Sequence, residues 1–149
     1  MLSKPATMLL GFIYEKPLNA YEIIKLLNYM NVKWWFHIAD STVYSTLKTL
    51  EKKEFISGTT EKVGNMPDRT VYKLSDKGKS EFINTLKASI LQFNYDTNIF
   101  SIAAFFLSTF TPDEQQELLQ ERLNILQKYR AGIDKQINPL WENEVSSAH

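Results

Sequence analysis

The stretch STVYSTLKTLEKKEF, residues 41–55, decides how the rest of the chain is interpreted. Its apolar residues Val43, Leu47 and Leu50 recur at spacings of four and three, the period of one face of an α-helix that ends near Lys53. The opposite face carries short polar and basic side chains, namely Thr42, Ser45, Lys48, Thr49 and Lys52. The pattern predicts a helix with one buried face and one polar face in solvent.

The residues after this helix have the alternating period of β-strands. Residues 55–63 and 69–74 are expected to form two strands, and the turn over 64–68 contains the strong breakers Gly64 and Pro67. The sequence therefore predicts a two-stranded β-hairpin directly after the polar helix.

Two further helices are expected upstream, over residues 4–14 and about 20–30. Pro17 ends the first, because the residue before a proline avoids helical geometry. Asn19 and Glu22 form a capping pair that starts the second. Three helices closed by a hairpin are the pattern of a winged helix-turn-helix.

Three more helices are expected downstream, over residues 76–95, about 97–108 and about 111–137. The last begins with TPDE at 111–114, which supplies an N-cap, a first-turn proline and a capping-box glutamate. Its seam follows alternating steps of four and three, through Leu119, Leu123, Leu126, Arg130, Ile133 and Ile137. Because so small a fold cannot cover this seam, the sequence implies that a partner chain packs against it.

These elements predict a mainly α-helical chain with a two-stranded β wing. Residues 1–90 are expected to form the winged helix-turn-helix domain, and residues 91–149 a helical dimerisation region with a candidate effector site. The first range holds 13 Lys and Arg against 9 Asp and Glu, and the second holds 4 against 8. A basic front half points to a polyanionic partner, although an uneven scatter of solvated charges would give the same numbers.

Composition excludes several classes of function. The chain has no cysteine, and its only histidines are His37 and His149, so no metal site or other cofactor is expected. No signal peptide is expected, and the apolar stretch 99–110 is shorter than the roughly 20 residues of a spanning helix, so we expect a cytoplasmic protein without a membrane partner. His37, Asp40 and Ser41 lie close in sequence, but no nucleophile-elbow or phosphate-loop pattern surrounds them, so an enzyme is not expected.

Two motifs are specific as a pair. YSTLKTLE at 44–51 has the form Tyr-x-x-Leu-x-x-Leu-Glu, and YKLSDKG at 72–78 has the form Tyr-x-Leu-Ser-x-x-Gly. Together with LG at 10–11 and LNAYEI at 18–23, they resemble the PadR family of winged-helix transcriptional regulators, named for the phenolic acid decarboxylase regulator. The resemblance covers roughly residues 8–80.

This resemblance implies a DNA-binding homodimeric repressor that acts on an inverted-repeat operator. In several members a small aromatic or hydrophobic compound releases the DNA. The chain departs from the family at two positions where glycine is usual, Ala20 before Tyr21 and Glu54 between the third helix and the first strand. A left-handed turn at Glu54 would be mildly strained.

On duplex DNA, the polar helix would enter the major groove, where short polar side chains reach base edges. Tyr44 either contacts a phosphate through its hydroxyl or is a core tyrosine with a solvated tip. The hairpin either contacts the minor groove or is simply solvated. The expected DNA-binding set is Thr42, Tyr44, Ser45, Lys48, Thr49, Lys52, Lys62, Asn65 and Arg69.

Aromatic side chains provide candidate walls for an effector pocket. They are Trp34, Trp35, Phe93, Phe100, Phe105 and Phe106. The alternative is that such rings fill the core or a dimer interface, with one tryptophan in each place. Arg130 either sets the register of the helical seam or supplies a counter-charge to a ligand.

The competing hypothesis is a winged-helix module that binds another protein instead of DNA. Salt dependence separates the two. The logarithm of affinity for duplex DNA falls with the logarithm of salt concentration by about 0.9 for each phosphate neutralised.

Overall fold

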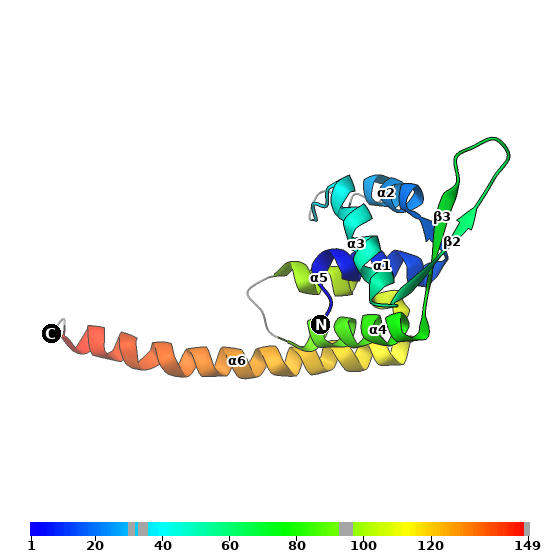
Figure 1. Cartoon of the computed structure of the whole chain (residues 1–149). Coiled ribbons are helices and arrows are strands. Elements are labelled where there is room, and N and C mark those ends of the chain that lie inside the picture. Colours follow the sequence, from blue (N-terminus) through cyan, green and yellow to red (C-terminus); the bar gives the residue numbers. More distant parts are fainter. Residues whose placement is uncertain (30–31, 33–35, 93–96, 148–149) are drawn as a thin grey trace.

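Figure 1 shows the computed structural model of the chain, which describes residues 1–29, 32, 36–92 and 97–147. Its first half contains α1 (Lys4–Glu15), α2 (Ala20–Tyr29), α3 (Asp40–Lys52) and a hairpin of β2 (Ile56–Glu61) and β3 (Arg69–Leu74). This order confirms the winged helix-turn-helix expected from the sequence.

A third strand corrects the expected two-stranded wing. β1 (Leu18–Asn19) lies between α1 and α2 and joins an antiparallel sheet of order β1-β3-β2. Leu18 pairs with Tyr72, and Asn19 pairs with Val71. Sequence periodicity could not show this strand, because two residues carry no alternating pattern and their partners lie far along the chain.

The second half consists of α4 (Asp76–Leu91), α5 (Thr97–Phe105), a 3-10 turn (Leu107–Thr109) and α6 (Pro112–Ser147). Figure 1 shows that α6 lies along α4 and then continues beyond it as an arm. The boundaries differ from those expected, because α4 and α5 end earlier and α6 passes through Pro139. An interior proline removes one i→i−4 hydrogen bond and crowds the carbonyl four residues earlier, which is why the sequence suggested that the helix ends before it.

α1 is the central helix of the core. All residues from Ala6 to Ile13 are buried. The Phe106 ring lies directly over Gly11, where a Cβ atom would overlap it, and meets the Phe12 ring edge-on at 5.7 Å between centroids. One hydrophobic cluster therefore runs across residue 90, and the division into two domains at that point stays a prediction.

Two helix starts confirm the capping signals of the sequence. The Asn19 Oδ1 atom accepts from the Glu22 N–H at 2.8 Å, and the Asn19 amide donates to Glu22 Oε1 at 2.9 Å. At α6, the Thr111 N–H donates to Glu114 Oε2 at 2.9 Å, and Thr111 Oγ1 accepts from the Glu114 N–H at 3.3 Å. Each pair satisfies donors that a helix start leaves without partners.

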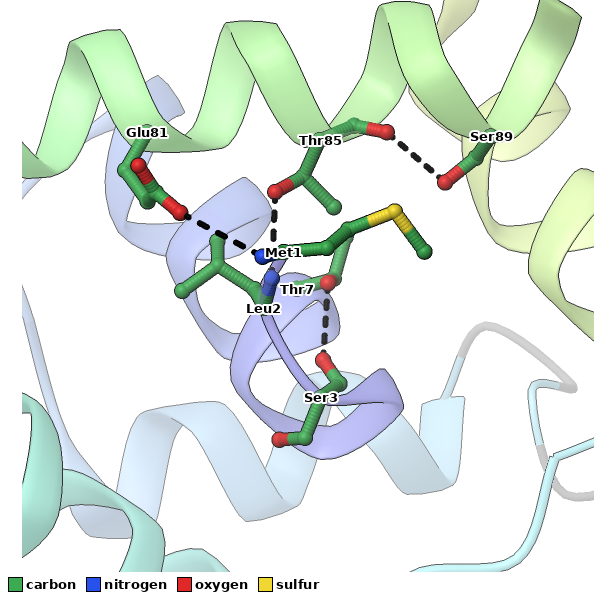
Figure 2. A network of polar contacts seen from close by, with 7 residues as sticks. All are labelled: Met1, Leu2, Ser3, Thr7, Glu81, Thr85 and Ser89. Carbon is green, nitrogen blue, oxygen red and sulfur yellow. Dashed lines mark hydrogen bonds and ion pairs between the residues drawn. The ribbon is translucent and has the colours of Figure 1, made fainter. Parts of the chain in front are cut away.

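The residues before α1 are held against α4 (Figure 2). The Met1 ammonium lies 3.9 Å from Glu81 Oε1, and the Leu2 N–H donates to Thr85 Oγ1 at 3.2 Å. These contacts fix α1 relative to α4.

α3 ends in a Schellman motif. The Phe55 N–H donates to the Leu50 carbonyl at 3.0 Å, and the Glu54 N–H donates to the Glu51 carbonyl at 2.9 Å. Glu54 has a φ of 62°, so the chain makes a left-handed turn here although the usual glycine is absent. The turn at the end of the polar helix is thus made by a residue that does not favour it.

We expect Glu54→Gly to raise the free energy of unfolding by about 0.5–1 kcal/mol, because glycine adopts a positive φ without the cost that a Cβ imposes. Chemical denaturation measures the change. Glu54→Val should lower the free energy of unfolding, since a β-branched residue tolerates this conformation poorly. Equal stability of all three proteins would contradict the assignment of strain to this turn.

Candidate nucleic-acid interface

α3 buries its apolar face completely. Val43, Leu47 and Leu50 are 0–2% exposed, as their spacing predicted. The polar face remains on the surface: Tyr44, Ser45, Lys48, Thr49 and Lys52 are exposed, and Thr42 is half-buried. The structure thus confirms a helix with one buried and one polar face.

The hydroxyl groups on this face bond to their own helix. Ser45 Oγ donates to the Thr42 carbonyl at 3.2 Å, and Thr49 Oγ1 donates to the Ser45 carbonyl at 3.1 Å. Their lone pairs therefore remain free to accept hydrogen bonds from a partner. Tyr44 is 52% exposed, so its ring is not part of the core.

The wing extends away from the helices (Figure 1). Its tip turns at Gly64, which has a φ of 58°, and exposes Lys62 and Asn65. Arg69 is half-buried, and its Nη2 atom lies 3.5 Å from Met66 Sδ. The expected wing residues therefore gather at and near the tip.

A backbone junction connects α3, the wing and α4. Ser75 Oγ lies 2.6 Å from the Glu54 carbonyl oxygen and 3.0 Å from that of Phe55, and it accepts from the Gly78 N–H at 3.0 Å. A Cβ atom on Gly78 would overlap the Phe55 carbonyl. This junction fixes the angle between the polar helix and the wing, and no local sequence pattern indicates it.

Tyr72 lies on β3, where the charge of Glu51 on α3 influences its hydroxyl. It pairs with Gly58 across the hairpin, and a Cβ on Gly58 would lie 3.1 Å from Glu51 Oε1 and 3.3 Å from the Tyr72 ring. Burial, and secondarily the negative charge of Glu51, raises the pKa of the Tyr72 hydroxyl above its ordinary value. Tyr72 is thus a structural group at the base of the wing.

The expected dimerisation residues lie along α6. Leu119, Leu123 and Ile133 are 40%, 47% and 48% exposed, and Leu126 is half-buried. The side chain of Ile137 lies outside the described part of the structure. The described residues form an apolar stripe that this chain leaves uncovered.

Three of the six expected effector residues belong to the part of the chain that the structure describes, and these three differ in burial. Trp34, Trp35 and Phe93 lie outside the described residues. Phe106 is buried in the core, and half-buried Phe105 meets it edge-on at 4.9 Å. The pocket therefore stays a prediction.

The described residues contain no group of three His, Cys, Asp or Glu side chains that could hold a metal ion. In the same parts of the chain, no helix is both long enough and apolar enough to span a bilayer.

A family model, described as the transcriptional regulator PadR-like family, matches residues 9–84, just over half of the chain. The chain belongs to this family. The resemblance seen in the sequence is thereby confirmed. PadR-like proteins are transcriptional regulators, so this chain is a regulator and not an enzyme.

Two solved structures resemble this PadR-like chain over most of its length. Bacillus subtilis PadR in complex with operator DNA has a TM-score of 0.53 and 21% identity, covering 91% of this chain and 76% of that one. The protein smu.1604c of Streptococcus mutans UA159 has a TM-score of 0.52 and 21% identity, covering 97% and 82%. At this identity both likenesses establish the fold alone. Comparison with curated proteins gave no match.

Proposed function

We propose that this PadR-like regulator binds double-stranded DNA as a homodimer, with α3 in the major groove and the wing along the minor groove. The observation that carries the proposal is the complete division of α3 into a buried apolar face and a surface of hydroxyl and ammonium groups. The similar Bacillus subtilis PadR was solved with operator DNA, which supports the same partner here.

The chemistry of the polar face fits both phosphates and base edges. Lys48 and Lys52 supply positive charge, and the hydroxyls of Ser45 and Thr49 accept from base donors or, by giving up their helix bonds, donate to phosphates. The exposed Tyr44 ring can rest on the protein while its hydroxyl donates to a phosphate. The face carries no Arg or Asn, the commonest base readers, so we infer that DNA shape supplies part of the specificity.

The homodimer is proposed from the uncovered stripe on α6. To bind as a dimer, the protein would have to present its two α3 helices to successive turns of one duplex, about 34 Å apart, and such a dimer requires an inverted-repeat operator. We propose repression as the mode of regulation, because a dimer seated on such a site excludes other proteins from it.

We also propose that a small aromatic or hydrophobic effector releases the DNA. Phe100 and Phe105 are half-buried, whereas Phe106 is a core residue. Adding such compounds to the DNA complex tests release directly, and unchanged affinity across the set would remove the effector from the proposal.

Selection of bound sequences from a random duplex pool tests DNA binding and operator symmetry together. We expect an enriched inverted repeat whose affinity falls steeply with salt. Binding to no duplex would favour the alternative, a winged-helix module that binds another protein.

We expect Lys48→Ala and Arg69→Ala each to weaken operator binding about tenfold, because each removes one charge from the contact surface. The salt slope should decrease by about one unit in each variant, as measured by fluorescence anisotropy at several salt concentrations. Lys87→Ala, which removes an exposed charge from α4, is the control and should bind like the wild type. Unchanged affinity in both α3 and wing variants would place the contact surface elsewhere.

A further inference from the structure

Arg122 connects α6 to the body of the winged helix. Its Nη1 atom donates to the Ile90 carbonyl at 2.7 Å, across 32 positions of sequence. Its guanidinium carbon lies 3.7 Å from the centroid of the Phe100 ring. One side chain of α6 thus contacts the last turn of α4 and also α5.

Both groups that Arg122 contacts attract a positive charge. The last carbonyls of a helix have no intrahelical donor and carry partial negative charge, so a cation at the end of α4 is favoured. The ring face of Phe100 also attracts a cation. Partial burial lowers the pKa of the Arg122 guanidinium, and limited access to water strengthens both contacts.

We propose that Arg122 is a positioning residue that fixes the direction of the α6 arm and thereby the separation of the two DNA-reading helices in the dimer. The inference rests on the proposed function, because it assigns a role within the DNA-binding homodimer. The side chain does not touch DNA in this proposal. It acts through the angle between α6 and α4.

A small change in the angle between α6 and α4 displaces the distant part of α6 by several ångströms. Ile133 lies 11 residues beyond Arg122, about 16 Å along the helix at 1.5 Å per residue. A rotation of about 10° at Arg122 would move the seam there by about 3 Å, and the partner's winged helix would move with it. Two α3 helices must reach half-sites about 34 Å apart, so an error of this size opposes simultaneous docking.

The direct test measures the separation in the dimer without DNA. The chain has no cysteine, so Ser80→Cys on the exposed side of α4 provides one spin-label site per protomer. We expect a narrow label-to-label distance distribution in the parent protein. Adding Arg122→Met should broaden it or shift it by about 3 Å while the protein remains dimeric. Arg122→Lys, which can still reach the carbonyl and the ring, should restore part of the narrow distribution.

Lys128→Met is the matched control, because it removes an exposed cation from the same helix outside the seam. It should leave the distribution unchanged. If the Arg122→Met protein does not fold, Arg122→Gln takes its place in the measurement. Glutamine keeps a donor for the Ile90 carbonyl and removes the positive charge. An unchanged distribution in the folded variant overturns the proposal, and so does a parent protein that is monomeric.

The difference in affinity between a full operator and a single half-site is a second measurement. A purely structural role of Arg122 would not change this difference. With a selected operator, Arg122→Met should lose at least about tenfold in affinity for the full site, while its affinity for a single half-site remains that of the parent. Equal loss on both duplexes would show general damage and contradict a positioning role. A dimer that binds no duplex refutes the proposed function instead, and the distance measurement still decides the role of Arg122.

Discussion

Gly78→Ala is expected to lower the free energy of unfolding by about 3 kcal/mol or more, a large share of the 5–15 kcal/mol that typically stabilises a domain. The added Cβ would overlap the carbonyl oxygen of Phe55. A backbone carbonyl cannot rotate away as a side chain can, and this one also accepts from the Ser75 N–H at 3.0 Å. The first turn of α4 would have to move from the end of α3, and the junction with the wing would open.

The expected sign is opposite to that of helix propensity, because alanine in a helix is normally more stable than glycine by about 1 kcal/mol. Gly132→Ala on the α6 arm is the matched control. A Cβ there would meet nothing within 4 Å, so this change should stabilise the protein slightly. Urea denaturation of both variants provides the comparison, and a Gly78→Ala protein as stable as the wild type would show that the junction is not tightly packed.

Leu123→Glu is expected to convert the dimer to monomers and to reduce operator affinity by a factor on the order of 100 to 10,000. Leu123 is 47% exposed, so the change should leave the monomer folded. In the proposed dimer, however, it places a carboxylate in an apolar seam without a partner. Two linked half-site contacts then become two separate binding events, which accounts for the size of the loss.

Asn124→Glu tests whether the added charge alone is responsible. Asn124 is the next residue on α6 and is an exposed polar side chain outside the seam, so this variant should remain a dimer. Sedimentation reports the oligomeric state, and binding to full operators and half-sites reports the function. A Leu123→Glu protein that sediments as a normal dimer would move the interface away from this stripe.

The sequence predicted the elements that depend on neighbouring residues. The period of Val43, Leu47 and Leu50 located α3 and its buried face, and the structure confirms both. The capping pair at Thr111 and Glu114 located the start of α6. These signals are readable because helix periodicity and capping operate within a few residues.

Sequence patterns do not predict the roles of residues whose partners lie far along the chain. No local pattern distinguishes Arg122 from the other cations of this acidic half of the chain, because its contacts with Ile90 and Phe100 form only when three helices pack together. By its sequence Phe106 is a candidate pocket wall, but its ring fills the space over Gly11 and is buried in the core. Composition and periodicity report that a side chain is apolar or charged, and they do not report which surface it meets.

The sequence by itself determined the order of helices and hairpin, the polar face of α3 and the apolar seam of α6, because each follows from the local period of side chains. Only the tertiary structure decided that Leu18 and Asn19 form a third strand, that Gly78 must lack a side chain and that Arg122 joins the arm to the body. The reason is that these three features depend on contacts between residues far apart in the sequence, which no local sequence pattern predicts.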